Sequence, residues 1–455
     1  MNMLGLFHTH TIEEITGIGT NVSVEMRNRI ELWNQMMSGD APWNRKAPSC
    51  GILGQISGRL STLVIREIGV ESDNKAIEGV IRHLNANADR IVSFMALLGG
   101  CLVRPIFSGG RLQYEMIPLG NYLPTRYDFD GTLTGALILK NIEHGRKRWL
   151  LTEEHTFENG IHSVKCTLYR NDDGILKRTS LSDCPQTQNV TEGYAWQNVR
   201  EPMIVEFRNH DINRIDGSDV PTAIIAGAEE LIKEADEQFA RMNWEQIAGE
   251  KKIFADRDMF QRRQKRNGVE TADITTLRPE LNKLIVQIEG DGSADGKKIT
   301  EFSPSLRTAE QNEMFQQILR RIELTCNIGK GTLSDMESQI QTATQYSGGR
   351  QELYAVIDRI EDEIEEKYRK CAKVFAHMAA AYGIGANDGE IRIKWSDDQT
   401  RKDITQAKQM ALQEISSGVK NKWEYRREFF GESEADARAN VPEEPAAPDP
   451  FNFGA

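Results

Sequence analysis

Apolar residues recur at helical spacing near the beginning of the chain. In Val24–Gly39, Ile30 and Trp33 fall on one side, and a Ser-Gly-Asp-Ala-Pro sequence ends the pattern. The stretches 54–66 and 89–98 show the same spacing with Ile, Leu, Val, Phe and Met residues. Each stretch therefore predicts a short amphipathic helix that packs on a broader surface.

Between Cys101 and Phe207 the pattern changes to short β-rich runs separated by Gly, Asn and Asp turns. The runs are Leu102–Phe107, Leu112–Ile117, Ala136–Lys140, Arg148–Thr152 and Val164–Arg170. This pattern predicts a mostly antiparallel sheet, which is the broader surface that the first helices need.

A long acidic helix is predicted after Gly217, with Ser218 as its cap. Apolar residues recur there in steps of three and four, namely Ile224, Ala228, Leu231, Ala235, Phe239 and Met242. Acidic residues crowd the other faces, namely Glu229, Glu230, Glu234, Asp236 and Glu237. The helix can therefore bury only a narrow stripe, and both a surface helix and a helix packed between subunits fit this periodicity.

The region 249–304 is polar and rich in turns. It contains a basic cluster of Arg262, Arg263, Lys265 and Arg266, a strand-like run at 284–288 and a hairpin-like stretch at 290–298. Thr308 and Gln311 form a capping-box pattern that opens the next helix. The order predicts a helix that leaves the body, an inserted module and a helix that returns.

Flexible and strongly helical segments alternate beyond the returning helix. Residues 327–350 are rich in Gly, Ser, Thr and Gln and predict a flexible or partly helical loop. Gln351–Tyr382 is the strongest helical pattern in the chain, with a stop at Gly383, and its roughly 30 residues would span about 45 Å. There follow an alternating strand around Ile391–Trp395, helices at 404–416 and 420–429, and a proline-rich tail from 442 that is expected to be disordered.

The composition is that of a folded protein with more than one structural region. The chain has 455 residues, of which 39% are hydrophobic and 27% charged. Its longest apolar stretches, such as Ile91–Cys101, are too short to span a membrane, and no signal peptide opens it, so a cytosolic protein is expected. A net charge of −12 argues against tight gripping of nucleic acid, although an acidic chain can still guide DNA.

Cysteine and histidine spacing does not indicate a metal site or a disulfide framework. The six cysteines lie far apart without CxxC spacing, at Cys50, Cys101, Cys166, Cys184, Cys326 and Cys371. They are expected to be reduced and structural. His8 and His10 lie close together, but no paired ligands accompany them. The sequence therefore predicts no metal and no cofactor.

The order of these segments and the character of their residues resemble those of the portal proteins of tailed bacteriophages, particularly the type found in phages of Gram-positive bacteria. The resemblance covers most of the chain. The stretches that carry it most specifically are Trp244–Phe254, Phe302–Arg307 and Gly329–Asp335, and Ile30–Trp43, Thr342–Tyr354 and Ile393–Ile404 extend it.

The resemblance implies an α+β portal-type fold that assembles as a ring of twelve copies. The implied regions are a β-rich wing at 1–217, a stem helix at 218–248, a small α/β clip at 249–304, a second stem helix at 305–326, a tunnel loop at 327–350, a long wing helix and strand at 351–400, a short helical crown at 401–441 and a disordered tail at 442–455. The short region after the long helix departs from larger relatives and argues against a large crown.

The same resemblance implies a non-enzymatic channel at one capsid vertex, through which DNA is packaged and ejected. The implied partners are further copies of the chain, double-stranded DNA, terminase, major capsid and scaffolding proteins and a head–tail adaptor, with assembly in the host cytoplasm and residence in the virion. The tunnel-loop residues Lys330, Thr332 and Ser334 are expected to face DNA. The cluster of Arg262, Arg263, Lys265 and Arg266 is expected to contact partners, and solvated surface is the alternative for both sets.

Simple physics is consistent with a ring. Helices with narrow apolar stripes bury too little surface alone, and they gain buried surface when copies pack side by side. A head-to-tail contact that closes on itself makes a ring with a central hole. An acidic lining would repel phosphate, so that DNA slides without sticking.

One motif suggests an enzyme instead. Asp128 and Asp130 in the sequence DFDGTLT have the spacing of the nucleophile and acid–base residues in haloacid-dehalogenase-type magnesium phosphatases. That chemistry needs the first aspartate at the end of a buried parallel strand, whereas Pro124–Tyr127 precedes it here. A hairpin turn explains the same residues, so no catalytic residue is predicted. A cytosolic helical scaffold remains the third hypothesis.

Overall fold

The computed structural model describes residues 12–65, 68–172, 175–256, 261–266, 269–274, 284–288, 299–335, 351–394, 404–430 and 432–441. The chain is mixed α and β, with 42% helix and 24% strand, as the α+β prediction requires. It divides into two compact units, one of residues 1–65 and 70–393 and one of residues 66–69 and 394–455.

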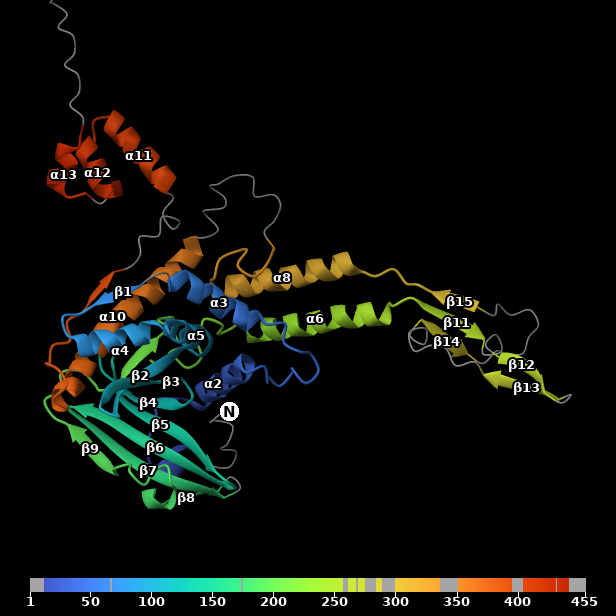
Figure 1. Cartoon of the computed structure of the whole chain (residues 1–455), viewed down its shortest axis with the longest axis horizontal. Coiled ribbons are helices and arrows are strands. Elements are labelled where there is room, and N and C mark those ends of the chain that lie inside the picture. The colour runs from blue at the N-terminus through green and yellow to red at the C-terminus, as the bar shows by residue number, and fades with distance from the viewer. Residues whose placement is uncertain are drawn as a thin grey trace, which may run out of the picture. The chain divides into compact units, whose positions relative to one another are not determined.

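Among the described residues, five helices and the short strand β1 (Gly69–Glu71) precede β2 (Gly100–Ser108) in the chain (Figure 1). The helices are α1 (Ile12–Thr16), α2 (Val24–Met37), α3 (Ile52–Val64), α4 (Lys75–Asn85) and α5 (Ala88–Leu98). The three predicted helices are confirmed as α2, α3 and α5, and the Ser23 hydroxyl caps α2 by accepting a hydrogen bond from the backbone N–H of Met26 at 3.1 Å. Helix α4 was not predicted, although Ile77, Ile81 and Leu84 bury one of its faces.

The β-rich region forms two antiparallel sheets, not the single sheet that was predicted. One has the order β10-β2-β3, with strands Val205–Arg208, Gly100–Ser108 and Arg111–Pro118. The other has the order β4-β5-β6-β7-β8, with strands Tyr122–Tyr127, Leu133–His144, Lys147–Glu158, Ile161–Asp172 and Ile175–Thr179, and β9 (Gly193–Trp196) also pairs with β7. All five predicted runs are confirmed, as β2, β3, β5, β6 and β7.

Strand β4 was missed because Pro124 lies within it. Proline lacks the N–H that a central strand must donate, and it is tolerated at a sheet edge. β4 is the edge strand of its sheet, and the carbonyl of Pro124 accepts a hydrogen bond from the backbone N–H of Asn21 at 2.8 Å. The edge is therefore partly covered by the segment before α2.

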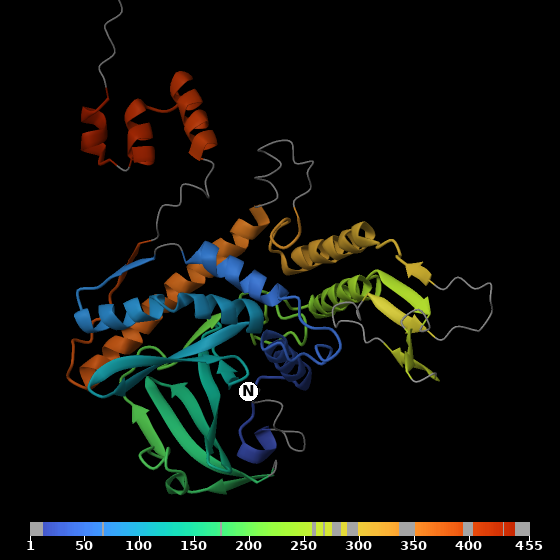
Figure 2. The same cartoon turned by 45° about the vertical axis from the view of Figure 1, so that its right-hand side comes forward.

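The long predicted helix is confirmed as α10 (Gln351–Ala381), whose 31 residues span about 46 Å. It packs against α3, α4, β2, β3 and β10, and Figure 2 shows it crossing over the smaller sheet. Its buried Glu363 accepts the backbone N–H of Arg208 at 2.9 Å, and the rings of Tyr368 and Phe207 meet edge to face. Gly383, with a φ of +68°, ends the helix as predicted.

One short strand before α4 pairs with a strand that follows α10. β1 (Gly69–Glu71) and β16 (Arg392–Lys394) form a two-stranded sheet. The second unit contains α11 (Ile404–Ser416), α12 (Lys422–Phe430) and α13 (Glu434–Ala439). The two predicted helices are confirmed as α11 and α12, while the predicted disordered tail lies outside the described residues.

Two buried histidines form a hydrogen-bonded chain within the larger sheet. The backbone N–H of Met203 donates to Nδ1 of His162 at 3.2 Å, and Nε2 of His162 lies 3.0 Å from Nδ1 of His155. Because Nδ1 of His162 accepts, its Nε2 carries the proton and donates to His155. Burial lowers the pKa of both imidazoles, and that of His162 falls to about 3.

Stability should fall as the pH drops below about 6.5, where histidines of an unfolded chain take up protons. The folded chain binds the proton of His162 only near pH 3, so the stability contributed by neutral His162 is complete above pH 6.5 and is lost as the pH falls. Between pH 7 and pH 5, the free energy of unfolding of His162→Gln should fall by about 1–2 kcal/mol less than that of the native chain. Urea denaturation at the two pH values measures both. His144→Gln on an exposed turn is the control, and equal losses in all three proteins would contradict the prediction.

The core contact of α10 is tested by Ile364→Ala. Ile364 is fully buried, so the change should lower the free energy of unfolding by about 2–5 kcal/mol. Ile212→Ala, at an exposed position, should change it by less than about 0.5 kcal/mol. Urea denaturation measures both, and similar midpoints for the two variants would show that α10 does not pack as described.

Candidate functional site: the helix pair and its loop

Two helices run side by side and are joined through a β module (Figure 1). Their bounds are Glu229–Ala248 for α6 and Thr308–Cys326 for α8. The side-chain amide of Gln238 on α6 donates to the side-chain oxygen of Gln311 on α8, and the rings of Phe239 and Phe315 lie 6.3 Å apart. The predicted outgoing and returning helices are therefore confirmed, and they form a pair.

The described residues of the module between the helices form strands. They are β11 (Lys252–Asp256), β12 (Gln261–Arg266), β13 (Val269–Ile274), β14 (Ile285–Ile288) and β15 (Ile299–Phe302). β11 pairs in parallel with β14 and antiparallel with β15, while β12 and β13 pair with each other. The strand predicted at 284–288 is thus confirmed as β14, and the hairpin predicted at 290–298 lies outside the described residues.

Helix α6 begins at Glu229, so the prediction of a start at Ser218 is wrong. Pro221 and Gly227 lie between the two positions, and the φ of +87° at Gly227 is left-handed backbone that interrupts a helix. The hydroxyl of Ser218 accepts a hydrogen bond from the side chain of Asn213 at 3.1 Å and caps nothing on α6. Local turn geometry thus overrides the apolar periodicity of this segment.

Two acidic residues of α6 face inward. Glu229 accepts a hydrogen bond from Nε1 of Trp33 at 2.9 Å. Asp236, two turns later on the same side, accepts from Nε1 of Trp43 at 2.9 Å and from the backbone N–H of Cys50 at 2.8 Å. Both carboxylates are buried, although the sequence placed them on outer faces. They attach α6 to the segment that contains α2.

Helix α8 begins at Thr308 as predicted, but the predicted capping box does not form. The side-chain amide of Gln311 donates to Glu245 of α6 at 3.1 Å. The guanidinium of Arg307 donates to both carboxylate oxygens of Glu245, at 3.1 and 3.3 Å. Gln311 is therefore engaged by the neighbouring helix and is not available to cap its own.

Residues 327–335 fold back onto the end of α8 around one buried carboxylate. Glu323 is fully buried and accepts hydrogen bonds from the backbone N–H groups of Gly331, Leu333 and Ser334, at 3.2, 2.6 and 2.7 Å. It also accepts the Ser334 hydroxyl at 2.9 Å. A carboxylate with four donors is a strong anchor, and no sequence pattern pointed to it.

The predicted tunnel-loop residues differ in their surroundings. Lys330 is exposed, while the hydroxyl of Thr332 donates to the carbonyl of Ile328 at 2.7 Å. Ser334 is only 7% exposed, and its hydroxyl is bonded to Glu323. Lys330 is therefore the member of this set whose side chain is free to meet a ligand, and residues 336–350 lie outside the described part of the chain.

The predicted basic cluster lies on β12. The strand register places Arg262 opposite Asp273 and Lys265 opposite Glu270 on β13. In the same register Arg263 is opposite Ala272 and Arg266 is opposite Val269. The cluster is therefore part of a regular hairpin and not of an irregular loop.

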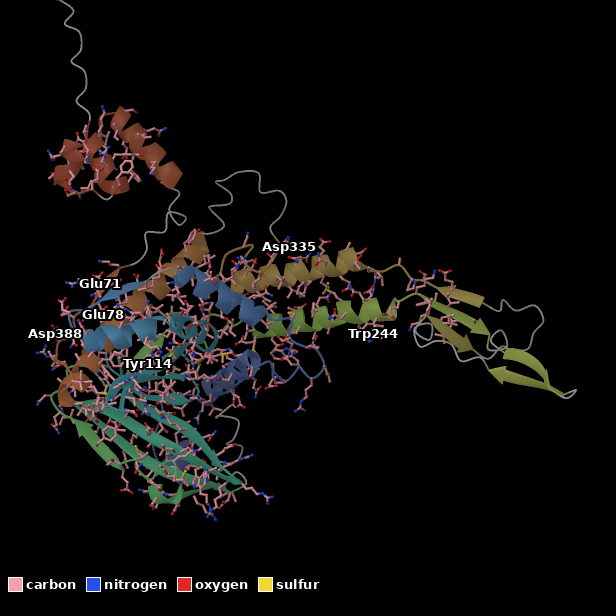
Figure 3. The ribbon with its side chains drawn as sticks, viewed as in Figure 1. Glu71, Glu78, Tyr114, Trp244, Asp335 and Asp388 are labelled. Carbon is pink, nitrogen blue, oxygen red and sulfur yellow. The ribbon has the colours of Figure 1, made fainter. Side chains whose placement is uncertain are left out.

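Large apolar side chains on both helices are exposed. On α6, Trp244 and Ile247 are 68% and 66% exposed, and on α8 Leu324 and Met314 are 55% and 44% exposed. Figure 3 labels Trp244 near the end of α6 that leads to the β module, where it lines a groove with Leu306 and Arg307. The predicted stripe residue Phe239 is also partly exposed, at 37%. The pair thus offers apolar surface to a partner.

The DFDGT sequence forms the predicted hairpin turn between β4 and β5. The backbone N–H of Gly131 donates to the carbonyl of Asp128 at 2.9 Å, and that of Thr132 donates to the carboxylate of Asp130 at 2.8 Å. The two strands are antiparallel, and the carboxylate of Asp130 accepts a hydrogen bond within its own turn. The parallel strand that a phosphatase nucleophile needs is not at this position.

Across the described ranges, no group of three or more His, Cys, Asp or Glu side chains is placed to hold a metal ion. In that same part of the chain, no helix combines the length and apolar character needed to cross a bilayer.

The anchoring role of Glu323 is tested by Glu323→Gln. Hydrogen bonds to a charged acceptor contribute about 1.5–3 kcal/mol each, so losing the charge should free the loop locally. We expect hydrogen exchange at the amides of Gly331, Leu333 and Ser334 to accelerate at least tenfold, which corresponds to about 1.4 kcal/mol. Glu313→Gln on the exposed side of α8 is the control, and unchanged exchange in Glu323→Gln would contradict the role.

Neither a comparison with models of protein families nor a comparison with curated proteins finds a match for this chain. The function is therefore inferred from the chain's own residues and geometry.

Proposed function

We propose that this chain is the portal protein of a tailed bacteriophage, the ring at one capsid vertex through which DNA enters and leaves. The order of elements supports this proposal. A β-rich body is followed by α6, a β module, α8, a loop and the long helix α10, as in the wing, stem, clip, tunnel loop and wing helix of such proteins. The three helices of the second unit correspond to a short crown.

The single observation that carries the proposal is the exposed apolar surface of the α6–α8 pair. Trp244 and Ile247 lie on one helix and Met314 and Leu324 on the other, all well exposed in a single copy. Exposed patches of this kind mark surfaces that are covered by a partner. Copies arranged side by side around an axis cover them without any further protein, and a head-to-tail contact of that kind closes into a ring.

The charges of the pair suit a passage for DNA. Acidic residues outnumber basic ones on α6. A lining of this sign repels phosphate and lets a duplex slide. The exposed Lys330 on the loop anchored by Glu323 would supply transient contacts to the backbone of passing DNA.

In this proposal the β module is the clip, which meets terminase during packaging and the head–tail adaptor afterwards. The basic residues of β12, Arg262, Arg263, Lys265 and Arg266, are its candidate contacts. The wing and crown would meet the major capsid and scaffolding proteins. Twelve copies, assembly in the host cytoplasm and residence in the virion complete the proposal.

The proposal predicts closed rings of the full-length protein. Native mass spectrometry should give one high-order species, and negative-stain images should show rings with a central hole, because the apolar stem surface is covered only in an assembly. A protein that stays monomeric at high concentration across salt and pH would contradict the proposal. Magnesium-dependent phosphatase activity lost in Asp128→Asn would favour the enzyme hypothesis instead.

A further inference from the structure

The outward side of α6 carries a regular stripe. Its positions are Glu230, Lys233, Glu237, Ala240, Trp244 and Ile247, in alternating steps of three and four residues. Residues at this spacing share one side of a helix. The helix faces α8 with other residues, Gln238 and Glu245 among them, so the stripe is left over from the contact within the pair.

Helix α8 carries a second stripe on its own outward side. Its positions are Glu310, Met314, Gln317, Arg321 and Leu324, again in steps of four and three. Gln311, Phe315 and Ile322 lie on the side toward α6 or in the core. The pair therefore presents two different stripes on two different sides, which is the condition for a head-to-tail contact between identical copies.

Contacts within the pair fix which residues share a level along it. Gln238 lies beside Gln311 at one level, and Glu245 beside Arg307 nearer the module. At the opposite end Thr325 lies 3.9 Å from the position of a Cβ on Gly227. The two helices are therefore antiparallel, and a residue further along α6 is level with one nearer the start of α8.

In a ring, residues at the same level on neighbouring copies lie side by side. Rotation about an axis that runs along the helix pair preserves height, so each α6 residue meets the α8 residue of its own level on the next copy. At a common level lie Glu230 with Arg321, and Glu310 with Arg241, which borders the stripe beside Glu237. Both pairs have opposite charges, and all four side chains belong to exposed residues. Within one chain Glu230 pairs with Lys233 and Arg241 with Glu237, both at the surface.

The apolar residues match by the same rule. Glu237 and Ala240 are level with Met314, which is 44% exposed, while Trp244 lines a groove with Leu306 of its own chain. Charge complementarity and apolar surface therefore coincide at one register. A parallel contact of α6 with α6 would place Glu230 and Glu237 against the same residues of the next copy, whereas the α6-to-α8 contact places Glu230 against Arg321.

We infer that the outer face of α6 on one copy binds the outer face of α8 on the next copy, in the register that joins Glu230 to Arg321, Arg241 to Glu310 and Glu237 to Met314. The inference rests on the proposed ring. It deepens that proposal by naming the partner surface and the residues that meet.

Crosslinking of mixed single-cysteine variants tests the register. Five of the native cysteines are buried and Cys50 is half-buried, so exposed introduced thiols react preferentially. Full-length Glu237→Cys and Met314→Cys chains are mixed, assembled and treated with a short bifunctional thiol reagent. We expect a dimer band in the mixture at least tenfold stronger than with either variant alone. A mixture of Met314→Cys with Ile161→Cys, on the exposed end of β7, is the control.

Each outcome has a separate meaning. Rings in negative stain without the mixed crosslink overturn this register and leave the ring proposal standing. Strong homodimers of one single variant would indicate a two-fold contact and overturn the inference. Failure to form rings at all overturns the proposed function.

Charge reversal provides an independent test in the full-length chain. Glu230→Lys and Arg321→Glu each place like charges opposite one another, so each should raise the protein concentration needed for half-assembly about tenfold. The double variant restores opposite charges and should return within about twofold of the native value. A double variant as defective as the two singles combined would overturn the pairing, and circular dichroism of each variant controls for folding.

Discussion

The arrangement depends on buried carboxylates that hold the helix pair to the body of the first unit. Glu229 and Asp236 on α6 accept hydrogen bonds from Trp33 and Trp43, and Glu323 on α8 accepts four from the following loop. A buried carboxylate without donors costs far more than one that is fully satisfied, so Glu229 and Asp236 fix α6 on the body and Glu323 fixes the following loop on α8. These side chains are therefore used for contacts within one chain and are not available to a neighbouring copy.

The opposite sides of the pair remain free, and this has a functional consequence. Apolar side chains such as Trp244 and Leu324 stay exposed although the rest of the first unit has a well-buried core. The inner contacts thus set the orientation of the surface through which copies of the chain would meet. The same anchoring places the exposed Lys330 on a loop whose start is held rigidly by Glu323. Assembly and contact with DNA would then both depend on the buried carboxylates of α6 and α8.

Much of the element order could be predicted from the sequence, because helical periodicity in α2, α3, α5 and α10 and the β-rich runs are local signals. The start of α6 could not, since the left-handed Gly227 overrides the continuous apolar pattern from Ile224. The capping box at Thr308 failed because Gln311 is used by α6, a contact between residues far apart in the sequence. The inward roles of Glu229, Asp236 and Glu323 were missed for the same reason, since acidic residues on a helix are usually solvated.

The central claim is that α6 and α8 surround a passage made by identical copies. A cryo-electron microscopy reconstruction of the assembled full-length protein tests it most directly. The account predicts a closed ring in which the helix pairs line a central opening and Trp244 lies between neighbouring copies. A reconstruction with the helix pairs on the outside, or with Trp244 exposed to solvent in the assembled particle, would contradict it.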